Sequence, residues 1–487
     1  MGISAKIIMI KTKEEIFMLN IPEYKSAERV FHYFEEISKI PHGSGETDRI
    51  ADYLVSFANE RGLFVKRDAA NNVIIRKNAT RGYTDRPTVI IQGHTDMVLA
   101  RTADCTKDLS CEGLDLYRDG DFLRARGTTL GGDDGVAVAY ALALLESEDI
   151  PHPELEVVLT SDEEIGLLGA VALDARELRG RVMINVDSDD EGLFIAGCAG
   201  GMRIDAKISA RTEKTVTNGV RVAISGFKGG HSGALIHKPH ANAIKVLGEL
   251  LSSLGGQIGA LKGGNADNAI PREAECVVYG VDAAVLREAC AKMQEKYADV
   301  EPDGKYEVTE NVVAKIYPAE VSRRVIELIC EEPNGVVAMS EEISGQVETS
   351  LNMGILECDD KEITVSFSLR SAKGAKKEEL ATRVTKIAES KGAICDAHGA
   401  YPAWEYRKES PLRNTICNVY KKMYGTEAKV VTIHAGLECG IFSDKMEGLD
   451  CISMGPNSYD IHTTEEHLSI SSTARVWEFL KEVLKSI

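Results

Sequence analysis

The chain has 487 residues, with 57 Lys and Arg against 76 Asp and Glu, which gives a formal net charge of −19 at pH 7. With 44% apolar residues and ordinary glycine and proline contents, it can bury sizeable cores, which excludes a collagen-like or disordered protein. The acid excess argues against nucleic-acid and anionic-membrane binders, because such surfaces need Lys and Arg. At roughly 150 residues per domain, the length indicates about two to four domains.

The cysteines and the N-terminus indicate a cytoplasmic protein. The eleven cysteines are scattered from Cys105 to Cys451 without a C-x-x-C pair, which favours buried thiols over a disulfide framework. The apolar run at residues 7–10 is too short for a signal peptide, and Lys6 stands where a myristoylation signal requires Ser or Thr. The longest apolar stretch, residues 136–145, falls short of the roughly 20 residues that cross a membrane.

Alternating helices and strands predict an α/β domain in the first part of the chain. Apolar residues at helical spacing predict a helix over residues 30–37, before Pro41, and an Ala- and Leu-rich helix over residues 136–145. Apolar, β-branched runs that end in polar clusters predict strands at residues 72–75, 88–91, 155–159 and 182–186. This alternation indicates a mostly parallel sheet, whose ligand sites lie at the carboxyl ends of the strands.

The pattern changes near residue 200 and returns near residue 400. A strand at residues 221–224, a helix at residues 243–254 and Gly-rich loops predict an inserted α+β domain. After it, strands at residues 429–433 and 451–454 and a final amphipathic helix resume the α/β texture. We therefore expect one α/β domain formed by residues 1–202 and 399–487, with residues 203–398 inserted into it.

Polar clusters follow the predicted strands of the α/β domain. His94 and Asp96 come after the run at residues 88–91, and Glu163 and Glu164 come after the run at residues 155–159. Each cluster has a commoner explanation when taken alone, such as a capped surface histidine or a solvated acidic loop. Of two adjacent glutamates, one can bind a metal ion while the other acts as a general base.

Three more positions complete the pattern. Asp133 lies in a Gly-rich turn before the helix at residues 136–145, Asp187 follows the run at residues 182–186, and His462 follows a late strand. Because each cluster follows a strand, we expect all of them to meet in one crevice. Two imidazoles and three carboxylates are the ligand count for two Zn²⁺ ions roughly 3.5–4 Å apart, and Mn²⁺ or Co²⁺ would suit the same ligands.

Six motifs, with these clusters in this order, resemble the M20 family of co-catalytic zinc peptidases, and within it the aminoacylhistidine (Xaa-His) dipeptidases. The resemblance extends from about residue 22 to the end of the chain. The motifs are ARGTTLGGDDG (125–135), GCAGG (197–201), GGHSG (229–233), NAIPRE (268–273), ETSLNMG (348–354) and HAGLECG (434–440). The family pattern implies a zinc-peptidase catalytic domain with a mostly parallel central sheet, plus an inserted α+β lid domain that also supports dimerisation.

The resemblance also implies the ligands of two Zn²⁺ ions. The residues that match the family's ligands are His94, Asp133, Glu164, Asp187 and His462, with Asp133 bridging the two ions. Asp134 stands where the family often has Asn, which adds negative charge beside the bridge.

The remaining family positions concern catalysis and substrate. Asp96 would orient His94 as a neighbouring carboxylate, and Glu163 would be the general base. His231 in the inserted domain matches the family's donor to the developing oxyanion. Asn268 and Arg370 match substrate-binding positions, where Arg370 suits a free carboxylate. His434 and Glu438 lie in the HAGLECG motif and receive no role.

We therefore expect a cytoplasmic metallo-dipeptidase that hydrolyses unblocked dipeptides, including Xaa-His, with a bridging water activated by Glu163. Its expected partners are small peptides and a second copy bound through the lid domain, with no nucleic acid and no membrane. Two alternatives stay open. One is an N-acyl amino acid deacylase or carboxypeptidase of the same fold, and the other is an inactive metal-binding homologue.

Overall fold

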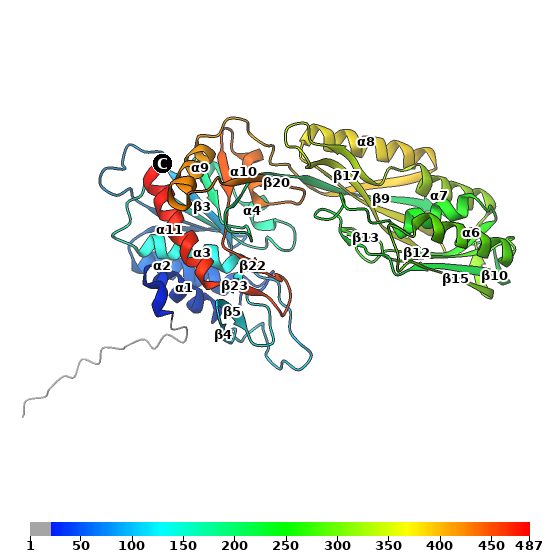
Figure 1. The fold of residues 1–487 in the computed structure, drawn as a ribbon, viewed down its shortest axis with the longest axis horizontal. Coiled ribbons are helices and arrows are strands. Elements are labelled where there is room, and N and C mark those ends of the chain that lie inside the picture. The colour runs from blue at the N-terminus through cyan, green and yellow to red at the C-terminus, as the bar shows by residue number, and fades with distance from the viewer. Residues whose placement is uncertain (1–20) are drawn as a thin grey trace, which may run out of the picture.

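The computed structural model describes residues 21–487, so the expectations for the first twenty residues lie outside the described part. Figure 1 shows an elongated molecule with one large sheet at each end. The first and last parts of the chain form the body at the left, and the green-to-yellow segment forms the body at the right. Within residues 21–487, no helix is both long enough and apolar enough to cross a membrane.

The body at the left is built on an eight-stranded sheet with the order β1-β2-β6-β3-β7-β21-β8-β20. Its centre, β6-β3-β7-β21, is parallel, and β20 also runs parallel to β8. The other pairings are antiparallel, so the predicted α/β sheet is confirmed with antiparallel pairings on both sides of its parallel centre. The strands are β1 (Phe64–Arg67), β2 (Val73–Lys77), β3 (Val89–His94), β6 (Leu155–Thr160), β7 (Val182–Asn185), β8 (Leu193–Cys198), β20 (Lys429–Ile433) and β21 (Asp450–Ser453).

Helices cover both faces of this sheet, because successive residues of its buried strands point to opposite sides. Val89 and Ile91 of β3 pack into a large core with α1, α2, α3, α9 and α11, whereas Ile90 packs into a smaller core with α4 and α10. The helices are η1 (Pro22–Ala27), α1 (Glu28–Ser38), α2 (Asp48–Glu60), α3 (Gly132–Glu146), α4 (Leu168–Ala172), η2 (Ala175–Glu177), α9 (Pro411–Tyr424), α10 (Glu438–Lys445) and α11 (Ile470–Ser486).

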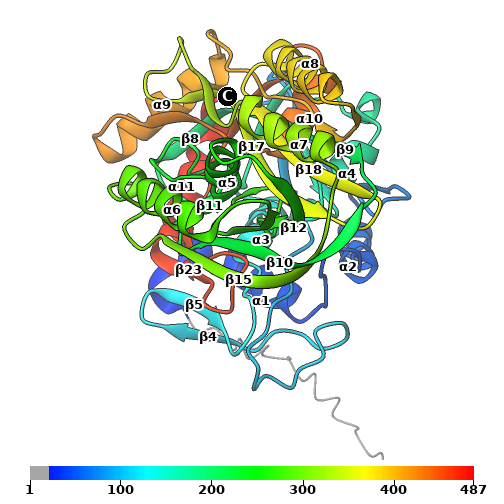
Figure 2. The same ribbon diagram turned by 90° about the vertical axis from the view of Figure 1, so that its right-hand side faces the viewer.

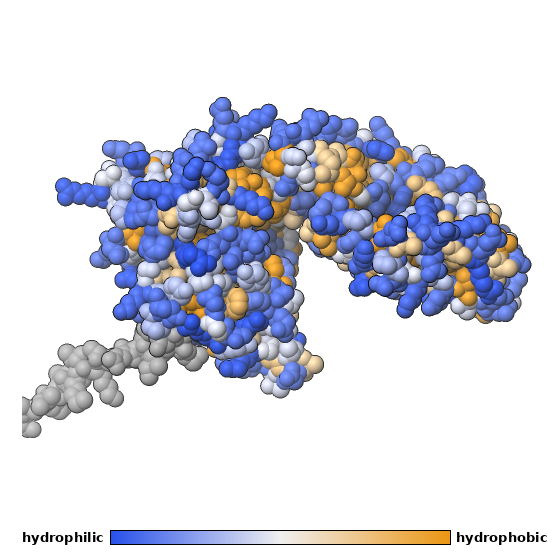
Figure 3. Space-filling view, viewed as in Figure 1, coloured by the Kyte–Doolittle hydropathy of each residue, from blue (hydrophilic) through white to orange (hydrophobic). Residues whose placement is uncertain are grey.

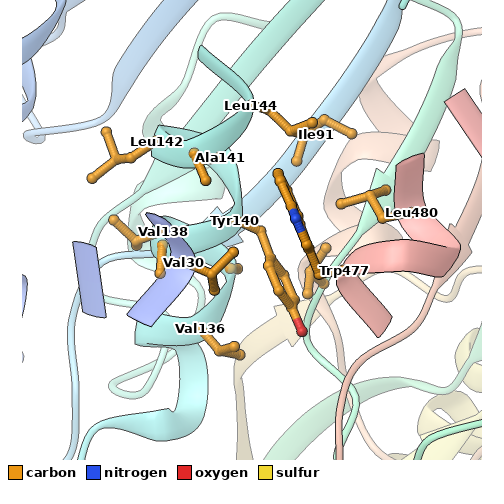
Figure 4. Close-up of a cluster of buried hydrophobic side chains, with 14 of the residues drawn as sticks. Val30, Ile91, Val136, Val138, Tyr140, Ala141, Leu142, Leu144, Trp477 and Leu480 are labelled. Atoms are coloured by element: carbon orange, nitrogen blue, oxygen red, sulfur yellow. The ribbon is translucent and has the colours of Figure 1, made fainter. Parts of the chain in front are cut away.

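Helix α3 lies at the centre of the larger core, as its Ala- and Leu-rich sequence predicts. The ring of Tyr140 stacks on that of Trp477 from α11, with centroids 5.8 Å apart and an interplanar angle of 10° (Figure 4). The Tyr140 hydroxyl donates a hydrogen bond to the backbone oxygen of Thr473 at 2.7 Å. The C-terminal helix thus completes a core that the first part of the chain begins.

The body at the right contains a nine-stranded antiparallel sheet, with the order β14-β10-β15-β12-β17-β18-β9-β19 and with β16 paired to β17. Four helices pack against it through a separate core, and Figure 2 views this body from its far end. The strands are β9 (Gly200–Ser209), β10 (Lys214–Ser225), β12 (Gln257–Gly263), β14 (Ala274–Tyr279), β15 (Lys305–Ile316), β16 (Gly335–Met339), β17 (Val347–Cys358), β18 (Glu362–Ser371) and β19 (Ala393–Tyr401). The helices are α5 (Ala243–Ser252), α6 (Ala283–Tyr297), α7 (Ala319–Glu331) and α8 (Gly374–Ser390), and a small ribbon pairs β11 (Gly230–His231) with β13 (Ala269–Ile270).

A four-stranded sheet with the order β22-β23-β5-β4 links distant parts of the chain. It pairs β4 (Leu116–Asp119) and β5 (Phe122–Ala125) with β22 (Ser458–Tyr459) and β23 (His467–Ser469). The loop between β22 and β23 therefore lies close to the segment that precedes α3.

The chain passes between the two bodies in extended strands. It leaves the central sheet after β8 and enters the second sheet at β9, and it returns after β19. The boundaries expected at residues 202/203 and 398/399 fall inside β9 and β19, so the division at those residues stays a prediction. Figure 3 shows a wide gap between the two bodies below this junction.

Candidate active site

Three of the polar clusters lie together at one edge of the central sheet. His94 is the last residue of β3, Glu163 and Glu164 follow β6, and Asp187 follows β7. Strands β6, β3 and β7 are parallel neighbours, so their carboxyl ends meet at the same edge. The sheet topology therefore brings these side chains together.

Asp133 and His462 reach this edge by a different route from the one expected. Asp133 lies in the first turn of α3, and His462 lies in the loop between β22 and β23 of the small sheet. Neither directly follows a strand of the central sheet, so our expectation that every cluster does was wrong for these two. The small sheet places them, because it pairs the two segments that carry the loops.

A buried glutamate fixes the loop that carries Asp133. The side chain of Glu466 is 3% exposed, and its two carboxylate oxygens accept the backbone N–H groups of residues 130–132 at 2.7, 3.0 and 2.8 Å. A longer bond of 3.4 Å comes from the N–H group of Asp133 itself. Glu466 lies in the same segment as His462, so this segment positions both the ligand residue and the Asp133 loop. Sequence reasoning missed this residue.

Asp133 lies between the two imidazoles. Its Oδ1 atom is 3.1 Å from Nε2 of His94, and its Oδ2 atom is 3.2 Å from Nε2 of His462. The same His462 nitrogen is 2.9 Å from Oε1 of Glu164. One oxygen towards each imidazole is the arrangement expected of a carboxylate that bridges two metal ions.

The donor set fits divalent cations. Candidate ligand atoms of His94, Asp133 and Glu164 lie within 4.8 Å of one another, and so do those of His94, Asp134 and Asp187. Hydrogen bonds to Asp133 and Glu164 raise the pKa of His462 to about 10. Burial acts to raise the pKa of Asp133, but its hydrogen bonds with the two histidines outweigh burial and lower it. Neighbouring carboxylates repel one another, and cations bound between them would offset that repulsion.

Asp134 is buried beside His94 and Asp187. It is 2% exposed, and its Oδ2 atom accepts the backbone N–H group of His94 at 3.1 Å. Burial raises the pKa of both Asp134 and Asp187, with the charge of Asp133 adding to the effect on Asp134 and that of Asp134 adding to the effect on Asp187. Asp134, whose charge is additional to the usual family pattern, is therefore hydrogen-bonded to the backbone of β3.

Asp96 holds both His94 and the loop after β6. Its backbone oxygen lies 2.9 Å from Nδ1 of His94 and its Oδ1 atom 3.4 Å from the same nitrogen. Its Oδ2 atom accepts the Ser44 hydroxyl at 2.8 Å. The backbone N–H groups of Glu163 and Glu164 donate to the same carboxylate at 2.9 and 3.3 Å. The orientation of His94 by the Asp96 carboxylate stays a prediction, and the bonds of Asp96 to the loop after β6 were not predicted.

Burial and like charge perturb Glu163. Burial raises its pKa to about 8, the charge of His94 opposes this, and the carboxyl groups of Glu438 and Glu164 add to it. Glu438 is itself fully buried below the strand ends, and its Oε2 atom accepts Nε2 of Gln92 at 2.5 Å and Oγ1 of Thr160 at 2.6 Å. Glu438 therefore ties α10 to β3 and β6, which the sequence alone did not reveal.

The remaining predicted residues lie in the inserted body. Arg370 is 8% exposed on β18, and its Nη1 atom donates to the Tyr401 hydroxyl at 2.9 Å. His231 lies on β11 and Asn268 just before β13, and both residues are exposed. Within residues 21–487, neither makes a hydrogen bond or an ion pair with the five predicted ligand residues, so the structure does not bring them into contact with that cluster.

A family model described as "Peptidase family M20/M25/M40" matches residues 90–486. The chain belongs to this peptidase family. It is 34% identical over 475 residues to the cytosol non-specific dipeptidase of Escherichia coli, covering 95% of this chain and 98% of that protein.

Solved structures agree with this assignment. The aminoacylhistidine dipeptidase of Vibrio alginolyticus has a TM-score of 0.86 and 33% identity, over 95% of this chain and 97% of that one. A metallo-carboxypeptidase of the M20 family from Sulfolobus solfataricus has a TM-score of 0.53 and 16% identity, over 94% and 99% of the two chains, and so shares the fold. The predicted fold class, an M20 catalytic domain with an inserted domain, is thereby confirmed.

Proposed function

We propose that the protein is a cytosolic dipeptidase that hydrolyses unblocked dipeptides, including Xaa-His, at a centre of two Zn²⁺ ions. The observation that carries this proposal is that Asp133 contacts both His94 and His462, that Glu164 contacts His462, and that Asp187 joins the same cluster through His94 and Asp134. The Escherichia coli and Vibrio alginolyticus relatives support the dipeptide as substrate.

The ligands of the two ions would be His94, Asp133, Glu164, Asp187 and His462, with Asp133 shared between them. Divalent metals in such a site lower the pKa of a water molecule and polarise a carbonyl group, and Mn²⁺ or Co²⁺ would suit the same donors. Asp96 keeps the ring of His94 in one orientation through its contact with Nδ1.

The protein's own groups would carry the protons. Glu163 takes a proton from the attacking water at its carboxylate and passes it to the nitrogen of the leaving amino acid. His231, from the inserted body, donates to the oxygen that becomes negative during attack. Because His231 lies apart from the ligand set, this step requires movement of the inserted body across the gap in Figure 3.

Arg370 supports a substrate with a free carboxylate. It is buried, and within residues 21–487 it forms no ion pair with an acidic side chain. A buried arginine without a counter-ion is costly, so a ligand carboxylate is the natural partner. Asn268 would contribute a further polar contact from the inserted body. Carboxypeptidases and N-acyl amino acid deacylases also bind free carboxylates. The assignment of a dipeptide as the substrate is therefore supported by the two similar proteins from Escherichia coli and Vibrio alginolyticus.

Side-by-side assays test this proposal. Protein loaded with Zn²⁺, Mn²⁺ or Co²⁺ is given Gly-His, β-Ala-His, other dipeptides, tripeptides and N-acetyl amino acids, and we expect hydrolysis of the dipeptides. Chelation should abolish turnover, and added metal should restore it. Intact dipeptides with all three metals would refute the proposal, and cleavage of N-acetyl amino acids alone would indicate the deacylase.

Replacement of Glu163 separates catalysis from metal binding. Glu163→Ala should keep its metal content while turnover falls by about 10²-fold or more. Glu465→Gln is a matched control, because Glu465 is an exposed acid near His462. Loss of metal in Glu163→Ala would show that the roles of Glu163 and Glu164 are exchanged. Light scattering would test the expected homodimer formed through the inserted domain.

A further inference from the structure

Four residues lie in one row across neighbouring strands at the junction of the two bodies. Ser350 of β17 pairs with Arg370 of β18, Arg370 pairs with Gly201 of β9, and Gly201 pairs with Tyr401 of β19. Directly opposed residues of antiparallel strands project from the same face of a sheet. The side chains of this row therefore share one surface, with Arg370 near its centre.

Gly201 leaves room for the Tyr401 ring. A Cβ atom at residue 201 would lie 2.5 Å from both Cζ and the hydroxyl oxygen of Tyr401, so any other residue would displace the ring. The ring extends across the glycine, and its hydroxyl accepts Nη1 of Arg370 at 2.9 Å. The glycine that ends the GCAGG motif thus permits this hydrogen bond.

The loop at residues 434–436 fixes both ends of the row. His434 at its start places Nε2 2.7 Å from the Ser350 hydroxyl oxygen. Gly436 also lies against the Tyr401 ring, where a Cβ atom would come within 2.8 Å of Cε2. The HAGLECG motif therefore holds the residues on either side of Arg370.

This environment leaves the charge of Arg370 available to a ligand. Burial, with the charge of Arg370, lowers the pKa of His434 to about 3, so its imidazole is neutral. The Tyr401 hydroxyl is neutral as well, because burial raises its pKa. The buried Nε atom of Arg370 has no hydrogen-bond partner within residues 21–487. The guanidinium is thus held by uncharged groups only.

We propose that Tyr401 and His434 are positioning residues for Arg370, which they hold in the one orientation that binds the α-carboxylate of the dipeptide's C-terminal residue. This inference rests on the proposed function, and it assigns roles to His434 and to the glycines of both motifs. The expected consequence is that substrates with a free C-terminal carboxylate have a lower KM than those with a carboxamide.

Tyr401→Phe removes the hydroxyl and keeps the ring. We expect KM for Gly-His to rise about tenfold, since a hydrogen bond to a charged group contributes about 1.5 kcal/mol or more. The value of kcat and the melting temperature should stay close to those of the parent protein. For Gly-His amide, which lacks the carboxylate, KM should not change. Tyr406→Phe is the matched control, because the Tyr406 ring contacts Arg413 through its face.

Binding measurements keep the two proposals distinguishable. Calorimetry with free L-histidine and with L-histidine amide measures carboxylate selectivity without turnover. Ser350→Ala, which removes the contact to His434, should weaken the binding of L-histidine and leave that of the amide unchanged. If dipeptides stay intact, the proposed function fails, while calorimetry still decides this inference. Equal effects of Tyr401→Phe on acid and amide, or none beyond those of Tyr406→Phe, would overturn it.

Discussion

Glu466→Gln tests whether a single side chain holds the Asp133 loop. The carboxylate accepts four backbone N–H groups, two on each oxygen. A glutamine keeps one oxygen and turns an NH₂ group towards the other pair of donors. The least costly orientation places the NH₂ group beside the N–H groups of Gly132 and Asp133, because the bond to Asp133 is already long at 3.4 Å.

The cost follows from the donors that lose their acceptor. Leaving one well-formed, buried N–H group unsatisfied costs about 1–3 kcal/mol, and the longer bond adds a smaller amount. We therefore expect Glu466→Gln to lower the free energy of unfolding of the metal-free protein by about 1–4 kcal/mol. The loop should also loosen around Asp133, so the metal content after dialysis should fall.

Urea unfolding and metal analysis, both performed on purified protein, measure these two effects. Glu465→Gln makes the same chemical change at an exposed neighbour whose side chain forms no hydrogen bond or ion pair within residues 21–487, and it should match the parent protein in both assays. If Glu466→Gln unfolds at the same urea concentration as Glu465→Gln and keeps its metal, then the carboxylate does not hold the loop and our reasoning is refuted.

Three further variants probe other parts of the molecule. Tyr140→Phe should lower the free energy of unfolding by about 1 kcal/mol in urea titrations, because it loses the hydrogen bond to Thr473 and keeps the stack on α11. Gly93→Ala should reduce metal content, because its Cβ atom would lie 2.5 Å from Oδ2 of Asp134 and so disturb the support of β3; unchanged content would contradict this. Burial raises the pKa of Glu332 to about 8, so the folded protein keeps a proton there that the unfolded chain has already lost. The free energy of unfolding therefore falls as the pH rises from the ordinary pKa of a glutamate to about 8. Glu332→Gln should therefore melt close to the parent protein at pH 5 and above it at pH 9, and a constant difference would refute the assignment.

The sequence was most informative where local pattern and position in the fold coincide. His94, Glu164 and Asp187 follow buried parallel strands, and an apolar run followed by polar residues predicts that geometry directly. Asp133 and His462 were found by residue type and order, but the route by which they arrive depends on a small sheet formed between distant segments. Short strands with little apolar character leave no such pattern.

Residues that act through others escaped the sequence analysis. Glu466 and Tyr401 lie in no motif that distinguishes them from a surface acid or a strand end, and Glu438 lies in the HAGLECG motif without a role that the sequence could assign. The roles of Glu466 and Glu438 come from contacts with groups hundreds of residues away, such as that of Glu438 with Gln92, and the role of Tyr401 comes from a contact with Arg370 on another strand. Glycines were the available signal: Gly201 and Gly436 lie in motifs that were noted, yet only the structure shows that both accommodate the same aromatic ring.

The position of His462 after the inserted body has a consequence for synthesis on the ribosome. His94 is made early, but the imidazole on the other side of Asp133, the carboxylate that fixes the Asp133 loop and the helix that stacks on Tyr140 all come after the inserted body in the sequence. On the proposed function, a nascent chain that has reached only the inserted body still lacks one candidate ligand, so it cannot cleave the peptides around it.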